Sequence, residues 1–202
     1  MQILDLSHPV VDGMPVYPGD PPAQVEVIAD YQTEGYSDHK LSASVHVGTH
    51  IDAPAHMIEG GKQLKDYPLE RFTVTAACVD ASSGFNITAI QKVATKGIGV
   101  LFYTGASDHF AEESYWHDFP VLSPECIKVL IDAGVELVGL DSNPDTVEGF
   151  PVHKTLLGAD ILLVENLANL KPLVGKTFEF QALPIKLEKD GAPVRAIARI
   201  DE

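Results

Sequence analysis

The sequence predicts an α/β fold in which one mixed sheet has antiparallel strands at both ends and βαβ units between them. Short strand-like segments occur near both termini, and apolar runs alternate with helix-start signals in the middle. The chain has 202 residues and shows no repeat or linker, and this length is typical of one compact domain. We therefore expect a single domain over residues 1–202.

The N-terminal part is expected to contain strands and an ordered loop. Strands are predicted at 3–6 and 25–29. The proline-rich segment 8–22 cannot form a helix or a central strand, and ordered loops of this kind often carry function. Residues 41–50 alternate strictly between apolar and polar side chains, which predicts one strand with a polar face. The segment after it, 51–68, is interrupted by proline and glycine and is expected to be a loop.

The middle of the chain is expected to alternate strands with helices. Thr88 and Gln91 form a capping-box pattern that predicts a helix ending near Gly97. Ser123, followed by proline, predicts the start of a second helix that ends at Gly134. The expected strands are 72–80, 98–105, 135–142 and 161–167, with a third, short helix at 153–159.

The C-terminal part is expected to return to antiparallel pairing. Segments 178–187 and 194–200 have strand-like patterns, and Asp190-Gly191 between them is a typical turn sequence. We therefore expect a hairpin at this end of the chain.

The charge balance and the cysteines limit the class of function. With 14 basic and 29 acidic residues, the formal net charge is -15, which argues against a nucleic-acid surface and against an anionic membrane. The sequence shows neither a signal peptide nor a run near the roughly 20 apolar residues of a membrane span. Cys78 and Cys126 lie in apolar surroundings and are expected to be buried and unpaired. We expect a cytoplasmic protein that acts on a small molecule.

The strongest chemical signal is the segment HVGTHIDAPAH (46–56). It places three of the chain's eight histidines and one aspartate at even positions within eleven residues. Because even positions of a strand share a face, His46, His50 and Asp52 are expected to point into one space, while His56 lies beyond a proline. Imidazole and carboxylate suit zinc, iron or manganese, and an incomplete ligand set is typical of a catalytic metal. The alternative, histidines that only satisfy local hydrogen bonds, is disfavoured because imidazoles seldom gather on one face.

Several other titratable residues are candidates for the site. Glu165 ends an apolar strand, where a ligand-facing carboxylate and a surface acid are equally expected. His153 opens a short helix, and its residues alone favour an exposed or capping role. Asp141, at the end of another strand, is a weaker candidate because aspartate there often starts a turn. The remaining histidines are expected to be surface residues: His8, His39, His109 and His117.

The histidine segment matches the HxGTHxDxPxH signature of the cyclase family of metal-dependent hydrolases, to which bacterial kynurenine formamidases and isatin hydrolases belong. Further stretches also resemble this family, so the resemblance covers nearly the whole chain. They are DLSHPV (5–10), MPVYPGDP (14–21), FPVHKTLLGADILLVENLANL (150–170) and ALPIKLEKDGAPVRAIA (182–198). The resemblance implies a domain of the swivelling β/β/α type that forms a homodimer or a larger homo-oligomer.

The resemblance also implies the ligands of one or two divalent metals per subunit, zinc or manganese. His46, His50 and Asp52 would bind a first metal, and Asp52 would bridge to a second. His153 would bind the second metal, and Glu165 would contact both.

The resemblance assigns two further roles in the same way. His56 would be the general acid/base, and Tyr17 stands where the formamidases have a substrate-contacting tryptophan. Met57 stands where the family commonly has phenylalanine, so both departures touch the substrate pocket and not the ligands. The implied activity is hydrolysis of a small amide, such as the aryl formamide N-formylkynurenine, by metal-activated water. The alternatives are hydrolysis of a cyclic amide, lactone or small ester, and a metal-binding protein without turnover.

Overall fold

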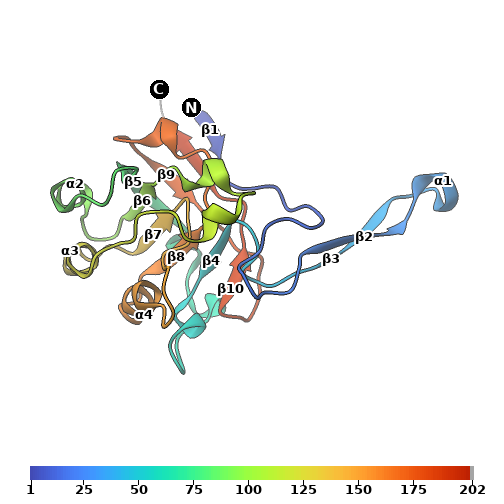
Figure 1. Ribbon diagram of the computed structural model, residues 1–202, viewed down its shortest axis with the longest axis horizontal. Coiled ribbons are helices and arrows are strands. Elements are labelled where there is room, and N and C mark those ends of the chain that lie inside the picture. The colour runs from blue at the N-terminus through green and yellow to red at the C-terminus, as the bar shows by residue number, and fades with distance from the viewer. Residues whose placement is uncertain (201–202) are drawn as a thin grey trace.

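The computed structural model describes residues 1–200, and a curled, mixed β-sheet forms the body of this part of the chain (Figure 1). The strands are β1 (Gln2–Asp5), β2 (Gln24–Ala29), β3 (Asp38–Ser42), β4 (His50–Asp52), β5 (Thr73–Asp80), β6 (Gly99–Tyr103), β7 (Leu137–Leu140), β8 (Leu162–Glu165), β9 (Thr177–Gln181), β10 (Gly191–Pro193) and β11 (Ile197–Ile200). The α-helices are α1 (Tyr31–Glu34), α2 (Ile87–Val93), α3 (Pro124–Ala133) and α4 (Pro151–Gly158). Short 3-10 helices are η1 (Pro54–His56), η2 (Leu64–Asp66), η3 (Leu69–Phe72), η4 (Ala106–His109), η5 (Glu113–Trp116) and η6 (Lys171–Leu173).

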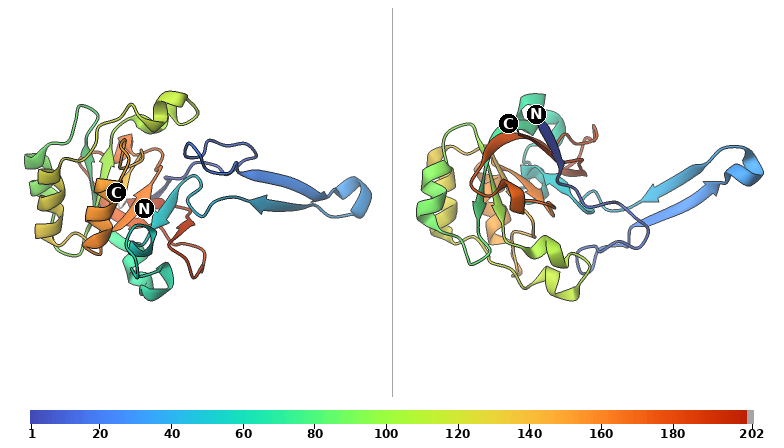
Figure 2. Two further views of the ribbon diagram at one scale, coloured as in Figure 1. Left: turned by 60° about the horizontal axis from the view of Figure 1, so that its bottom comes forward. Right: turned by 90° about the horizontal axis from the view of Figure 1, so that it is seen from above.

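The main sheet confirms the predicted mixed α/β architecture. Its strand order is β1-β11-β9-β5-β6-β7-β8-β4-β10. Strands β5 to β8 are parallel neighbours, whereas β9, β11 and β1 on one side and β4 and β10 on the other pair antiparallel. Helices α2, α3 and α4 connect the parallel strands and lie together on one side of the sheet (Figure 2). The βαβ units therefore stand in the centre of the sheet, as the alternating pattern predicts.

Two hydrophobic clusters cover the two faces of this sheet. Leu130 of α3 and Leu156 of α4 pack with Phe102 and Leu163 of the strands on the helical side. Alternate residues of the same strands pack on the other face, where Ile51 of β4 is fully buried. Because β4 alternates, its neighbours His50 and Asp52 must point to the face that α4 covers.

The helix ends differ in part from the expected boundaries. α3 begins as predicted, with the Ser123 hydroxyl accepting a hydrogen bond from the Cys126 amide. α2 begins one residue before Thr88, because the Asn86 side chain caps it by accepting a hydrogen bond from the Ala89 amide. The predicted Thr88 capping box is therefore wrong. α4 begins at Pro151, two residues before the expected start.

The prediction of one continuous strand over 41–50 is wrong. β3 ends at Ser42 and β4 begins at His50, and Gly48 between them has a left-handed φ of 58°. β3 pairs with β2, whereas β4 pairs with β8 and β10 of the main sheet. The chain must bend here because it passes from one sheet to the other.

The predicted C-terminal hairpin is correct in its pairing and wrong in its turn. β9 and β11 pair antiparallel, with Ile197 opposite Gln181. Gly191 does not close a tight turn, because it opens β10, a separate strand that pairs with β4 at the edge of the sheet.

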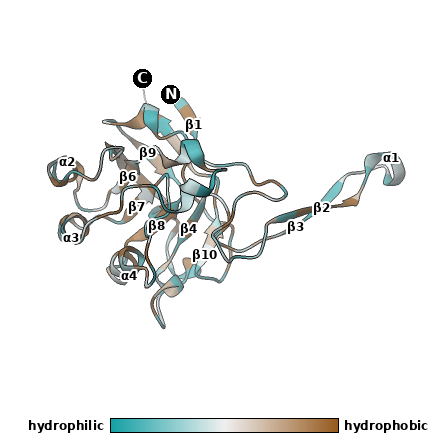
Figure 3. Cartoon of the chain, in the orientation of Figure 1, coloured by the Kyte–Doolittle hydropathy of each residue, from teal (hydrophilic) through white to brown (hydrophobic). Residues whose placement is uncertain are grey.

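Strands β2 and β3 form an arm that projects from the body, with α1 at its tip (Figures 1 and 2). Figure 3 shows that hydrophobic segments occur in this arm as well as in the main sheet. Several of its apolar side chains are exposed, including Val27 at 64% and Tyr31 at 69%. An isolated two-stranded hairpin is marginally stable in water, so this arm is a candidate surface for an interaction.

Two further expectations concern cysteines and membranes. Cys78 and Cys126 are buried and free, as predicted. Within residues 1–200, every helix is too short or too polar to serve as a membrane span.

Candidate metal centre and adjoining pocket

The pairing of β4 with β8 brings three of the predicted ligands together. His50 lies opposite Glu165 in this antiparallel pair, so both side chains point to the same face, and Asp52 follows two residues on. The His50 Nε2 atom is 3.5 Å from Asp52 Oδ1 and 3.8 Å from Glu165 Oε2. All three side chains are buried, at 3%, 0% and 2% exposure in the order His50, Asp52, Glu165. One strand pair thus places an imidazole and two carboxylates within metal-binding distance of one another.

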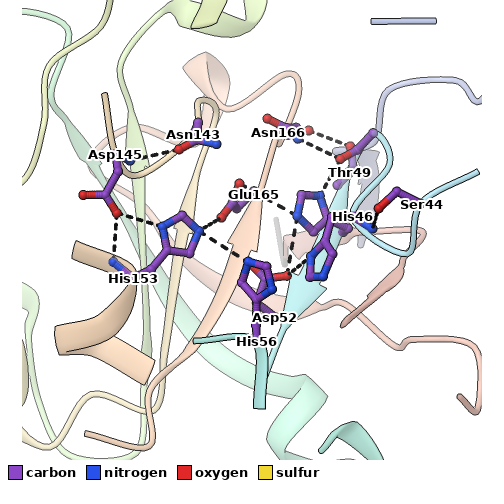
Figure 4. A network of polar contacts seen from close by, with 12 residues as sticks. Ser44, His46, Thr49, Asp52, His56, Asn143, Asp145, His153, Glu165 and Asn166 are labelled. Atoms are coloured by element: carbon purple, nitrogen blue, oxygen red, sulfur yellow. Dashed lines mark hydrogen bonds and ion pairs between the residues drawn. The ribbon is translucent and has the colours of Figure 1, made fainter. Parts of the chain in front are cut away.

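His153 reaches the same space from the first turn of α4 (Figure 4). Its Nε2 atom is 2.6 Å from Glu165 Oε1 and 3.9 Å from Asp52 Oδ2. Asp145 fixes the orientation of the His153 ring. Its Oδ2 atom lies 2.8 Å from His153 Nδ1 and also accepts a hydrogen bond from the His153 backbone amide at 3.0 Å. The same carboxylate accepts the Val152 amide and so caps a helix whose own N-cap residue, Phe150, offers no side-chain hydrogen bond.

His46 approaches from the bend before β4 and not from the strand itself. Its Nδ1 atom is 2.8 Å from Asp52 Oδ1, and its Nε2 atom is 2.9 Å from Asp190 Oδ2. The left-handed Gly48 makes this approach possible, because it turns the chain back over β4. His46 and Asp52 therefore converge as their even spacing predicts, although the bend before β4, and not strand alternation, brings them together.

The arrangement fits a bound divalent metal. Each of the three histidines has one ring nitrogen held by a protein oxygen: His46 by Asp190, His50 by the Gly48 carbonyl at 2.8 Å, and His153 by Asp145. The other nitrogen of each ring then faces the carboxylates, which is the orientation that metal-binding histidines adopt. Asp52 Oδ2 is buried and has no hydrogen-bond partner within the described residues. Because buried polar atoms are normally paired, this oxygen supports a cation as its missing partner.

The electrostatics of the cluster keep the carboxylate of Asp52 ionised. Burial alone would raise the pKa of Asp52, but His50 and His46 hold it well below its usual range. Burial opposes protonation of the imidazoles, yet Asp52 and Asp190 raise the pKa of His46 to about 9. Burial likewise opposes the charge on His153, but Glu165 and Asp145 raise its pKa to about 10. The site therefore has a strong negative potential, which protons on the histidines balance. A divalent cation that binds there would displace these protons.

His56 ends η1 and lies beside the cluster, half-buried. Its ring centre is 4.0 Å from that of His46 and 5.7 Å from that of His153. Its Nδ1 atom is 3.4 Å from Asp190 Oδ2, which leaves Nε2 free for proton transfer. Burial lowers the pKa of His56, which favours the neutral form of the ring. His56 also forms a group of close ligand atoms with His46 and Asp52, so its geometry permits either a ligand or an acid/base.

A pocket of about 260 Å³ opens onto the cluster. Its wall contains Tyr17, Trp116 and Phe150, and Tyr17 lies with its ring centre 5.8 Å from Trp116 and 6.3 Å from Phe150. His56 and Glu165 line the same pocket. A flat aromatic molecule could thus contact the aromatic wall while a polar group reaches the histidines.

Four residues of this site were not singled out from the sequence. Asp145 and Asp190 orient histidines, and Trp116 and Phe150 line the pocket. In the sequence, Asp190 stands with Gly191 in a typical turn pair, which predicts only a turn. The Asn143-Pro144-Asp145 sequence carried a turn signal, but nothing local linked Asp145 to His153.

The other candidates lie outside the cluster. Asp141 is buried and accepts hydrogen bonds from the Thr104 and Gly105 amides, so it joins two strand ends. His8 is not an exposed surface residue as expected, because it is half-buried and stacks on Phe110 with ring centres 3.8 Å apart. The other three histidines expected at the surface are exposed as predicted: His39, His109 and His117.

Comparison with known proteins gives likenesses that extend over the whole chain. A family model described as "Putative cyclase" matches residues 4–144. The kynurenine formamidase of Salinibacter ruber is 33% identical over 210 residues, which cover 98% of each chain. A solved structure titled as a potential metal-dependent hydrolase with cyclase activity is 29% identical, has a TM-score of 0.82 and covers 99% of both chains. Isatin hydrolase A from Labrenzia aggregata, bound to benzyl benzoate, is 26% identical with a TM-score of 0.88 and covers 100% of this chain and 94% of its own.

Proposed function

The chain belongs to the cyclase family, and we propose that it is a metal-dependent hydrolase of small amides, with an aryl formamide such as N-formylkynurenine as its substrate. One observation carries this proposal. Three imidazoles, each held through one ring nitrogen, converge on Asp52, whose buried Oδ2 atom lacks a partner within residues 1–200. An aromatic pocket opens directly onto that cluster.

Each protein residue of the site would have its own role in hydrolysis. A divalent metal at this site would supply water activated near neutral pH and would polarise the scissile carbonyl. His56 Nε2 would accept a proton as water attacks and return it to the leaving nitrogen. Asp52 and Glu165 would hold the cation and keep the site negatively charged. Tyr17 would stack on the aryl group of the substrate, which orients the carbonyl toward the histidines.

The substrate assignment is tested by metal content and turnover measured together. We expect untagged protein to contain about one or two equivalents of zinc or manganese and to hydrolyse N-formylkynurenine, and chelation to remove both. Restoring the metal should restore turnover. Metal-loaded protein that leaves N-formylkynurenine intact would contradict the formamidase assignment.

Hydrolysis of a cyclic amide such as isatin, a lactone or a small ester is the second candidate. The structural likeness to isatin hydrolase A favours it, and the aromatic lining of the pocket is chemically suited to a flat ring. A panel of N-formyl anilines, isatin-like rings and aryl esters separates the two candidates by their kcat/KM values. A metal-binding protein without turnover would load metal and leave every member of the panel intact.

The projecting arm supports a further proposal, that two or more copies of the chain associate. The exposed apolar side chains of the arm would be covered if it lay on a second copy, and a two-fold arrangement would cover both arms alike. We expect the double variant Val27→Asp/Ile28→Asp to sediment as a smaller species than the wild type. Glu26→Gln, on the same strand, is the control and should leave the sedimentation unchanged. A wild-type protein that sediments as a monomer would contradict this proposal.

A further inference from the structure

Asp190 contacts two histidines of the site through one oxygen atom. Its Oδ2 atom is 2.9 Å from Nε2 of His46 and 3.4 Å from Nδ1 of His56. The two rings lie 4.0 Å apart, tilted by 34°. The carboxylate of Asp190 therefore joins a candidate metal ligand to the candidate acid/base.

The backbone around Asp190 is held in place independently of its side chain. The Asp190 carbonyl accepts a hydrogen bond from the Ala53 amide at 2.7 Å, and Gly191 is the register partner of Asp52 in the β4–β10 pair. A Cβ atom on Gly191 would lie 2.6 Å from Cε1 of His46, so the His46 ring lies directly against the backbone of β10. Strand pairing thus fixes the point from which the Asp190 carboxylate reaches the two rings.

We propose that Asp190 is a positioning residue that fixes the tautomer and orientation of both His46 and His56. Its carboxylate accepts a hydrogen bond from Nε2–H of His46, and the same oxygen lies 3.4 Å from Nδ1 of His56, where it favours a proton on that nitrogen. This leaves Nδ1 of His46 facing Asp52 and Nε2 of His56 free for proton transfer. A carboxylate behind a catalytic or metal-binding imidazole acts in this way in many enzymes. The inference rests on the proposed hydrolytic function of the same site.

The other histidines of the site are held by protein oxygens in the same way, which supports a positioning role for Asp190. Asp145 holds Nδ1 of His153, and the Gly48 carbonyl holds Nδ1 of His50. Asp190 is the corresponding acceptor for His46, and its Oδ2 atom also lies close to Nδ1 of His56. Its side chain is 31% exposed, so its substitution disturbs the buried core less than a substitution of a candidate ligand would.

The test compares Asp190→Ala and Asp190→Asn with Glu188→Gln, a neighbouring charge change on the same segment. Zinc affinity is measured by competition with a chromophoric chelator, and the tautomers of 15N-labelled histidines are read by NMR in zinc-loaded protein. We expect Asp190→Ala to weaken zinc binding about 10–100-fold and to give His56 a mixture of tautomers. Asp190→Asn keeps an uncharged acceptor oxygen, so its loss of affinity should be smaller and in the same direction. Glu188→Gln should match the wild type.

Wild-type zinc affinity and unchanged His56 tautomers in the Asp190→Ala protein would overturn the positioning role. If this variant fails to fold, as judged by circular dichroism, Asp190→Asn decides in the same way. Neither measurement uses a substrate. Failure of every variant and the wild type to hydrolyse N-formylkynurenine would therefore contradict the proposed function without deciding the role of Asp190.

Discussion

Replacing Asp52 by alanine should abolish both metal binding and turnover, because this carboxylate is the group that all three candidate histidine ligands face. Its oxygens lie within 4 Å of ring nitrogens of His46, His50 and His153. Without Asp52, Glu165 is the one carboxylate left among the candidate ligands, and it does not contact His46 within the described residues. We expect kcat/KM to fall by about 10³-fold or more, since activation of water and polarisation of the carbonyl are each worth several kcal/mol.

The measurement is metal content by mass spectrometry together with kcat/KM on the best substrate of the panel. Asp132→Ala removes an exposed aspartate of α3 and is the matched control. It should keep the metal content and the kcat/KM of the wild type. The circular dichroism spectrum of Asp52→Ala should remain that of a folded protein, because the sheet around β4 keeps its backbone pairing. Asp52→Ala protein that still carries a full complement of metal would show that the cation is held elsewhere.

The central part of the fold could be predicted from the sequence because its signals are local. Strands β6 and β8 are apolar runs, and α3 carries a serine cap, a first-position proline and a terminal glycine within one short segment. The arm and the bend before β4 could not be predicted in this way. β4 is defined by its partners β8 and β10, which lie more than a hundred residues further along the chain, and period-two alternation alone cannot show where a strand changes sheets.

The residues of the candidate site also differ in whether the local sequence is enough to predict them. His46, His50 and Asp52 lie close together in the sequence, so their spacing alone indicated that they meet. Glu165 and His153 needed the family resemblance, because each has an ordinary local explanation. Asp190 is separated from His46 by 144 residues and looked like a turn residue, so only the tertiary contact reveals it.

Replacing His56 by asparagine should leave the metal in place and remove most of the turnover. General acid–base catalysis by a positioned side chain contributes about 10²–10⁴-fold, so we expect kcat to fall by that factor. Because His56 also lies close to His46 and Asp52, it could instead be a ligand, and the two roles predict different metal contents. His109→Gln, which alters an exposed histidine, is the control for the loss of an imidazole. Loss of metal from His56→Asn would identify His56 as a ligand, and near-normal turnover would rule out the acid/base role.

The pH profile gives an independent test of the same role. Burial lowers the pKa of His56 below its usual 6.5, and a nearby cation would lower it further. The neutral ring is the form that accepts a proton, and it predominates above this pKa. We therefore expect kcat/KM of the wild type to fall as the pH drops through a value below 6.5. In His56→Asn this acidic decline should vanish from the residual activity, because the group that becomes protonated is gone. A decline that persists unchanged in the variant would assign it to another group and leave His56 without a role in proton transfer.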